Sequence, residues 1–428
     1  MNYKLNNHLQ PEKGWMNDPN GFSYFGGRFH IFFQYAPDNG KKNWGHFSTS
    51  DFCTYEDHGI AIRPDTAYDR DGVYSGSCIV SGNDVCFFYT GNVKEEGDYD
   101  YIHGGRQQNI IRTDLKGNKK LLLSYMDYPD GFTRHIRDPK VFKESGIYYM
   151  LLGARDMDDR GCALLYSSTD LERWNHICRY DSDDPGYMWE CPDIVKLDDR
   201  YYLIICKQKK EGSTVGYYEL GRSLFNHGLL KEYHVLDYGH DFYATNTLVS
   251  DSGTMLIAWM GMCDFRYGFP EDAKQALTFP RYLSIRDGHI VQRPIAALKK
   301  LVTEKNTMIL DKDETIGLPD ACYLSLAGFE RDFEFEISGL KISFKDRLEF
   351  HYAEGGLNRE DRSIESSHVT NIGILHDGSS LEIFLNDGQY VFTTRTFCER
   401  KYILGRQPAR LTIEKIRPFV IERGECDV

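Results

Sequence analysis

Three acidic residues stand in short polar motifs in the first half of the chain. Asp18 lies in the motif WMNDPNG (15–21), Asp138 in RDP (137–139) and Glu190 in WECPD (189–193). Glycoside hydrolysis needs one carboxylic acid to protonate the leaving oxygen and one carboxylate to attack or to activate water. Crowded carboxyl groups do not all ionise easily, which keeps one of them protonated near neutral pH. Three acids gathered in one cavity would therefore suit the hydrolysis of a glycosidic bond.

Each motif by itself also has a simpler explanation. Asn, Asp, Pro and Gly favour turns, so the first motif is typical of a turn. The pair Arg137 and Asp138 fits a surface ion pair before a strand, and the motif around Glu190 fits a solvated acidic loop. The chemical interpretation depends on whether the fold brings the three motifs together.

An internal repeat supports that interpretation. Five times, a polar or acidic cluster is followed by a strand, a tight turn and a strongly apolar strand. We expect the apolar strands at Phe29–Gln34, Val85–Tyr89, Tyr148–Leu152, Tyr201–Ile205 and Met255–Trp259. A period of roughly 50 to 65 residues accommodates a four-stranded propeller blade. Five copies predict a five-bladed β-propeller, in which the clusters that open the repeats line one central funnel.

The rest of the chain also indicates β structure. Apolar stretches are short, rich in the 29 Tyr and 25 Phe residues, and bounded by turn formers. The nearest approach to a helical pattern is Ile295–Lys305. About seven short strands after it suit a β-sandwich. We therefore predict an all-β chain with a propeller over residues 1–297 and a C-terminal sandwich over 306–428.

Composition restricts the partners. The formal net charge of -13 repels nucleic acids and anionic membrane surfaces. Because no apolar run approaches the ~18 residues of a membrane span and the N-terminus lacks a signal-peptide core, we expect a cytoplasmic protein. The eleven cysteines form no C-x-x-C pair and the fourteen histidines no H-E-x-x-H motif, so we expect neither a metal nor a cofactor.

Taken together, the three motifs resemble the signature motifs of the invertase-type β-fructosidases, glycoside hydrolase family 32. The similarity continues along most of the chain. It includes Phe33–Tyr35, Trp44–His46, Tyr74–Ser77, Phe88–Asn92, Asp241–Ala244, Ala258–Met260, Leu277–Arg281 and Leu381–Gly388.

This resemblance implies a five-bladed propeller joined to a sandwich and a double displacement that retains the anomeric configuration. Asp18 would be the nucleophile and Glu190 the general acid and base. Asp138 would hold fructose hydroxyls and stabilise the transition state, with Arg137 beside it. The expected reaction releases terminal β-D-fructose from sucrose, sucrose 6-phosphate or short fructo-oligosaccharides.

Six further residues are candidates for binding the sugar. Asn17, Gln34 and Ser75 are able to hydrogen-bond hydroxyl groups, and Trp44, Tyr74 and Trp259 are able to present apolar walls. The two tryptophans also fit ordinary core packing. Cys191 follows the expected acid and fits either a tuning role or plain packing.

Two rival functions remain at this stage. One is an inverting five-bladed hydrolase that cleaves arabinan or xylan, and the other is a sugar-binding propeller without activity. Retaining carboxyl pairs lie ~5–5.5 Å apart and inverting pairs ~6.5–9.5 Å apart. The exact substrate, the ratio of hydrolysis to fructosyl transfer, and the choice between monomer and homo-oligomer stay open.

Overall fold

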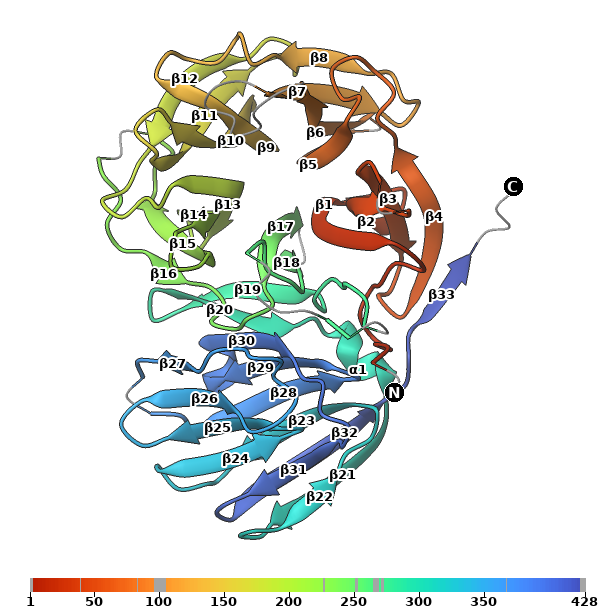
Figure 1. Ribbon diagram of the computed structural model, residues 1–428, viewed down its shortest axis with the longest axis vertical. Helices are drawn as coiled ribbons and strands as arrows, with labels where there is room; N and C mark the ends of the chain where they lie inside the picture. The colour runs from red at the N-terminus through yellow and green to blue at the C-terminus, as the bar shows by residue number, and fades with distance from the viewer. Residues whose placement is uncertain are drawn as a thin grey trace.

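Almost all of the regular secondary structure in the described residues is β-strand, as predicted from the sequence. The computed structural model describes residues 3–423 except 39, 83, 96–104, 226–227, 251–252, 265–268, 271–272 and 367. Within these residues seven sheets form, five in the first part of the chain and two in the second (Figure 1). None of the helices in the described residues has the length and apolar character required to cross a membrane.

Each of the first five sheets contains four consecutive antiparallel strands. The first comprises β1 (Trp15–Phe25), β2 (Arg28–Ala36), β3 (Asn43–Thr49) and β4 (Thr54–Ile62), and the second comprises β5 (Gly72–Ser81), β6 (Asp84–Lys94), β7 (Arg106–Asp114) and β8 (Lys120–Leu123). The third comprises β9 (Phe132–Glu144), β10 (Ile147–Asp156), β11 (Gly161–Ser168) and β12 (Asn175–Tyr180). The fourth comprises β13 (Met188–Leu197), β14 (Arg200–Gln208), β15 (Thr214–Gly221) and β16 (His234–Val235), and the fifth comprises β17 (Tyr243–Ser250), β18 (Gly253–Trp259), β19 (Arg281–Arg286) and β20 (His289–Pro294).

These five sheets surround a common axis and are called the five-sheet ring below (Figure 1). The strands β1, β5, β9, β13 and β17 lie innermost, each contacts the next, and β17 contacts β1. The second strand of each sheet is buried on both faces, which explains why β14 reads as an almost unbroken apolar run. Each expected apolar strand lies within one of these second strands.

The second part of the chain forms two six-stranded sheets that share one apolar core. One has the order β21 (Val302–Leu310), β32 (Ala409–Ile416), β23 (Ala321–Ala327), β28 (Asn371–Asp377), β29 (Ser380–Leu385), β30 (Tyr390–Arg395). The other has the order β22 (Thr315–Gly317), β31 (Tyr402–Gly405), β24 (Phe333–Ile337), β25 (Leu340–Phe344), β26 (Leu348–Tyr352), β27 (Arg362–Ile364). Side chains alternate between core and solvent in β24 and β25, as expected of sheets with one buried face. We call this part the two-sheet module.

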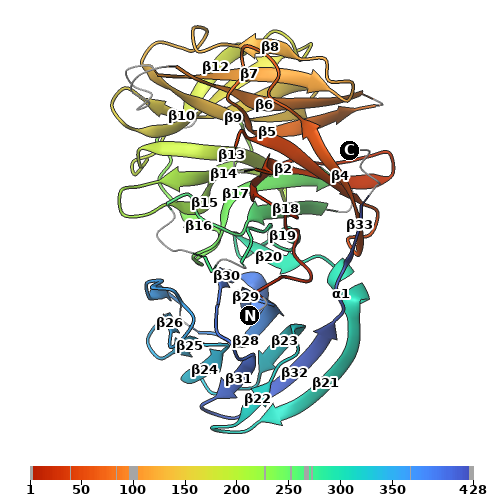
Figure 2. The ribbon, with the colours of Figure 1, turned by 45° about the vertical axis from the view of Figure 1, so that its right-hand side comes forward.

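Both ends of the chain cross between the two parts. A short helix, α1 (Ala297–Leu301), connects the ring to β21, and a single 3₁₀ turn, η1 (Asn386–Gly388), follows β29. After β32 the chain returns to the ring, where β33 (Val420–Arg423) pairs in parallel with β4 (Figure 2). At the other end, the backbone of Asn6 and Asn7 donates to Asp377 of the two-sheet module. The sequence-based division at residues 297 and 306 did not anticipate either crossing.

Candidate active site

A β-bulge interrupts each innermost strand of the ring at the polar cluster that opens its repeat. A bulge places an extra residue opposite its partner strand, bends the strand and redirects a side chain. In β1, Asp18 is the extra residue between the pairs Asn17–Gln34 and Pro19–Phe33. In an unbroken strand these side chains would alternate between two faces. The bulges instead turn them toward the axis of the ring.

Left-handed backbone marks the bulge in three of these strands. The φ angle is 61° at Asp138, 44° at Cys191 and 51° at Ala244. Non-glycine residues adopt this conformation at a cost that the surrounding structure must offset. Cys191 in the bulge of β13 occupies the same position as Asp138 in the bulge of β9. Glu190, one residue before Cys191, is therefore equivalent to Arg137. Glu190 thus stands one residue earlier in its bulge than Asp18 and Asp138 stand in theirs.

The three acids line one cavity of about 330 Å³ on the axis of the ring. Every site residue predicted from the sequence lines it except Trp44. The lining residues are Trp15, Asn17, Asp18, Gln34, Lys42, Tyr74, Ser75, Gln108, Arg137, Asp138, Glu190, Tyr243, Trp259 and Cys263. Residues from all five sheets therefore meet in one place.

The two predicted tryptophans have different positions. Trp44 is fully buried in a core cluster with Phe32 and Phe87, and its indole N–H donates to the carbonyl of Tyr74 at 2.9 Å. It therefore supports the cavity residue Tyr74 from behind and does not line the cavity, which corrects the expectation of a sugar-facing wall. Trp259 does line the cavity, edge-on to Trp15 with ring centroids 6.1 Å apart.

The carboxyl group of Asp18 is surrounded by side chains that donate to it. Asn17 Nδ2 donates to Oδ1 at 2.7 Å, Gln34 Nε2 donates to Oδ2 at 3.0 Å, and the Ser75 hydroxyl also donates to Oδ2. The pKa of Asp18 is raised above its usual value, because burial and the charge of Glu190 outweigh the hydrogen bonds from Ser75 and Asn17, which lower it. Two amide nitrogens that are able only to donate favour the ionised form. The arrangement suits a carboxylate that acts as a nucleophile or a base.

Asp138 lies deeper. Its side chain is 7% exposed, and Oδ2 accepts the backbone N–H of Cys191 at 2.9 Å. Burial raises the pKa of Asp138 to about 7, against a lowering by Arg137, while the negative charge of Glu190 adds to the rise. The Cys191 thiol lies 3.7 Å from Oδ2 of Asp138 and 3.9 Å from Oδ2 of Asp18. Cys191 thus bridges two of the acids.

Glu190 is held by three side chains from different strands. Arg137 donates to Oε1 from Nη2 at 2.6 Å and from Nε at 3.1 Å. Oε2 accepts from Tyr243 at 2.7 Å and from Gln208 at 2.8 Å. These contacts fix the carboxyl group in one orientation at the wall of the cavity. A group that must give and take a proton at one point in space requires such positioning.

Sequence reasoning missed five residues of the cavity, namely Trp15, Lys42, Gln108, Tyr243 and Cys263. Trp15 lies in the motif at 15–21 and Tyr243 in the motif at 241–244, so both could have been predicted as cavity residues from these motifs. Gln108, Lys42 and Cys263 stand in no polar motif of the repeat. No group of His, Cys, Asp and Glu within the described part of the chain has an arrangement that would hold a metal ion.

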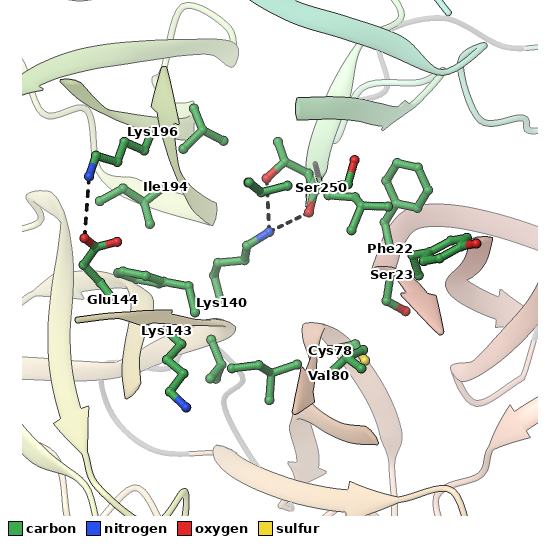
Figure 3. A pocket seen from close by; sticks show the side chains of 18 of the residues that line it. Phe22, Ser23, Cys78, Val80, Lys140, Lys143, Glu144, Ile194, Lys196 and Ser250 are labelled. Carbon is green, nitrogen blue, oxygen red and sulfur yellow. Dashed lines mark hydrogen bonds and ion pairs between the residues drawn. The ribbon is translucent and has the colours of Figure 1, made fainter. Parts of the chain in front are cut away.

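A second and larger cavity, of about 770 Å³, is lined by later residues of the same innermost strands (Figure 3). Its walls include Phe22, Val80 and Ile194. Three cations within the described residues line it. Lys140 donates to Thr247 and pairs with Asp193, Lys196 pairs with Glu144, and the ammonium of Lys143 lies 4.8 Å from the ring centroid of Tyr148. The three acids of the motifs face the smaller cavity, which we take as the candidate active site.

Comparison with known proteins agrees with this geometry. The glycosyl hydrolases family 32 N-terminal domain matches residues 8–294, and the family 32 C terminal domain matches residues 331–406. The chain is 34% identical to a sucrose-6-phosphate hydrolase of Klebsiella pneumoniae, over 91% of this chain and 88% of the relative. It is 31% identical to a raffinose invertase of Escherichia coli, with the same coverage of 91% and 88%.

Solved structures show the same fold along nearly the whole chain. A sucrose-6-phosphate hydrolase of Lactobacillus gasseri has a TM-score of 0.85 at 27% identity and covers 98% of this chain and 94% of its own. A β-fructofuranosidase of Bombyx mori, in a variant bound to sucrose, has a TM-score of 0.83 at 28% identity, with coverage of 98% and 95%. With both family domains matched in order and relatives above 30% identity, the chain belongs to glycosyl hydrolase family 32 and is an enzyme, a glycosidase, as its motifs predicted.

Proposed function

We propose that the protein is a β-fructofuranosidase that releases terminal β-D-fructose from sucrose or sucrose 6-phosphate with retention of configuration. The observation that carries this proposal is the contrast between two acids in one cavity. Asp18 is surrounded by donors that favour a carboxylate, whereas Glu190 is oriented by Arg137, Gln208 and Tyr243. One acid suits attack on carbon and the other suits proton transfer.

In the first step, Asp18 attacks the anomeric carbon of the fructosyl unit while Glu190 gives its proton to the departing oxygen. A covalent fructosyl ester forms on Asp18 and the glycosidic bond breaks. In the second step, Glu190 takes a proton from water, the water attacks the same carbon, and fructose leaves Asp18. Asp138 and Arg137 hold fructose hydroxyls and stabilise the positive charge that develops on the ring.

The remaining cavity residues suit a neutral polyhydroxylated ligand. Asn17, Gln34 and Ser75 provide hydrogen-bonding groups on one side. Trp15, Trp259 and Tyr74 provide apolar surface for sugar C–H groups. Hydrogen bonding and apolar contact together are typical of sites for small polar molecules, which agrees with the small-molecule partner expected from the sequence.

We also propose the finer architecture that the sequence predicted. The five-sheet ring would be a five-bladed β-propeller over residues 1–297, and the two-sheet module would be a β-sandwich over 306–428. Contacts between consecutive innermost strands support the first proposal, and the core shared by the two six-stranded sheets supports the second. Activity on short fructo-oligosaccharides and a cytoplasmic location stay predictions.

The test is incubation of the purified protein with sucrose, sucrose 6-phosphate, a kestose, inulin and an arabinan, followed by chromatography of the released sugars. We expect fructose from sucrose and sucrose 6-phosphate. Release of arabinose instead would support the inverting rival, and binding of sucrose without release would support the inactive propeller.

Retention has a separate test. The anomer of fructose formed in the first turnovers, before mutarotation, is observed by NMR. We expect β-fructofuranose, because two successive inversions restore the starting configuration. The α anomer as first product would reject the covalent intermediate on Asp18.

A further inference from the structure

Lys42 is a cavity residue that none of the motifs contains. It ends the segment that connects β2 to β3, and its own carbonyl accepts the backbone N–H of Val73 at 2.9 Å. Its ammonium donates to Oδ1 of Asn17 and lies 5.5 Å from the ring centroid of Trp15. The side chain therefore reaches into the cavity beside the proposed nucleophile.

The contact with Asn17 decides how the asparagine amide is oriented. Oδ1 of Asn17 also accepts the indole N–H of Trp15 at 3.0 Å. Two donors on the same oxygen leave the amide nitrogen for Asp18, to which it donates at 2.7 Å. The reversed amide would turn its oxygen toward the Asp18 carboxylate, so that two acceptors would face each other. Its N–H groups would point toward the Lys42 ammonium, so that two donors would face each other.

The charge of Lys42 acts on the same carboxyl group. Of the two cations that line the cavity within the described residues, Arg137 is bound to Glu190, whereas Lys42 lies near Asp18. Burial lowers the pKa of Lys42 to about 8, and the attraction of Asp18 opposes this lowering. Asp18 faces the charges of Glu190, Asp138 and Lys42, as well as the neutral thiol of Cys191. Lys42 is thus the positive charge that favours the ionised form of Asp18.

We propose that Lys42 is a positioning residue for Asp18: it fixes the Asn17 amide so that this amide donates to the nucleophile, and its charge favours the ionised form of the nucleophile. This proposal rests on the nucleophilic role proposed above for Asp18. Lys42 takes no part in bond making or breaking, and the substrate bonds to Asp18 alone.

The test compares Lys42→Met with Lys42→Arg and with Lys41→Met, a control that removes an exposed lysine from the same segment. We expect Lys42→Met to lower kcat by about tenfold and to shift the acid limb of kcat/KM upward by about one pH unit, because an opposite charge has been removed from the carboxylate. Lys42→Arg should keep the acid limb, and Lys41→Met should match the wild type throughout. A change in KM alone, or an unchanged acid limb, would overturn the proposal.

A second measurement does not require turnover. The protein is labelled with ¹³C at the aspartate carboxyl carbons, the Asp18 signal is assigned with Asp18→Asn, and it is titrated by NMR in the wild type and in Lys42→Met. We expect the Asp18 midpoint to rise by about one unit in the variant. An unchanged midpoint would reject the role of Lys42 even in an active enzyme. Failure of the wild type to release fructose would instead reject the proposed function.

Discussion

Three carboxyl groups of the cavity differ in the atoms around them, and this difference defines their chemistry at the scale of single residues. Asp18 accepts from amide and hydroxyl donors, Asp138 is buried against one backbone N–H, and Glu190 binds a guanidinium and a phenol. Burial and mutual repulsion favour protonation, whereas donors and cations favour ionisation. The balance between these effects differs at each acid, so one cavity holds carboxyl groups suited to different roles.

Replacement of the two proposed reacting acids should separate their roles. We expect Asp18→Asn and Glu190→Gln each to lower turnover of sucrose by at least ~10³-fold, because each removes an essential step. An aryl fructoside, whose leaving group needs little protonation, should restore part of the activity of Glu190→Gln and none of that of Asp18→Asn. Steady-state kinetics measure both effects, with the exposed Asp84→Asn as control. Equal rescue of the two variants would contradict the assignment.

The buried carboxyl group of Asp138 should lower the free energy of unfolding at neutral pH. Its pKa is raised to about 7 in the folded protein from 3.8, so the folded state holds an extra proton between these values and stability falls as the pH rises through this window. Since one pKa unit corresponds to about 1.4 kcal/mol, Asp138→Asn should stabilise the protein by a few kcal/mol at pH 8.

The same variant should show little gain at pH 3, below the unfolded-state pKa of 3.8, where the wild-type carboxyl group is mostly neutral in both states. Denaturant unfolding at the two pH values measures the difference. Asparagine keeps an oxygen that accepts the Cys191 N–H, so the wild type and the variant both make this hydrogen bond and differ in the carboxyl charge. A gain of the same size at both pH values would show that the carboxyl charge is not responsible.

At the scale of elements, the bulges explain how ordinary sheets deliver polar side chains to one point. An unbroken strand sends successive side chains to opposite faces, so neighbouring polar residues would diverge. The extra residue in each innermost strand breaks this alternation where the polar cluster stands. The left-handed backbone at Ala244 is part of the bulge in β17, beside Tyr243, which binds Glu190.

Substitution within this bulge should reveal the constraint. Valine at Ala244 would place a β-branched side chain in left-handed backbone at a fully buried site, which we expect to lower the free energy of unfolding by roughly 2 to 4 kcal/mol. Activity should fall as well, because Tyr243 would shift from Glu190. Thr245→Val is the matched control, since the buried hydroxyl of Thr245 has no hydrogen-bond partner among the described residues and valine has its shape. Thermal unfolding of the two variants tests the difference, and equal stability would contradict it.

At the scale of the whole molecule, buried charges join the ring to the two-sheet module. His8 of the N-terminal segment contacts Asp377 at 2.7 Å and Glu382 at 2.8 Å, and neither carboxyl side chain is exposed. Glu382 also binds Arg281 of β19, which in turn pairs with Asp237 of the ring at 3.0 Å. Opposite charges from separate parts of the chain, such as His8 and Asp377, thus neutralise one another at the junction of the two parts.

Loss of His8 should loosen this junction in a pH-dependent way. The pKa of His8 is raised to about 9 from 6.5, because the hydrogen bonds and charges of Asp377 and Glu382 outweigh burial. Its contribution to stability is therefore complete below pH 6.5 and is lost as the pH rises through about 9. We expect His8→Gln to lower the free energy of unfolding by roughly 3 to 5 kcal/mol at pH 6 and by less at pH 9.5.

The matched control for this experiment is His351→Gln. His351 also contacts a carboxylate, Asp361, at 2.7 Å, but both side chains are more than half exposed. Exposed ion pairs contribute little, so this variant should unfold like the wild type. Denaturant unfolding at both pH values measures the two variants. If His8→Gln lowered the free energy of unfolding equally at pH 6 and pH 9.5, the proposed positive charge on His8 would be contradicted.

The sequence by itself determined which strands form and how they repeat, and it indicated which acids are candidates for catalysis, because these features depend on neighbours within a few residues. Alternation, turn residues and the recurring polar clusters are all local patterns. They sufficed to predict a chain of β structure and a cavity lined by Asp18, Asp138 and Glu190, whereas the family was expected from the resemblance of the motifs.

Only the tertiary structure decided the rest. The place of Glu190 one residue before its counterparts, the burial of Trp44 behind Tyr74, and the approach of Lys42 to Asn17 all depend on contacts between separate strands. So do the return of β33 to the first sheet and the junction at His8. A side chain's burial and charge environment depend on what packs against it from distant parts of the chain, and no local pattern of residues carries that information.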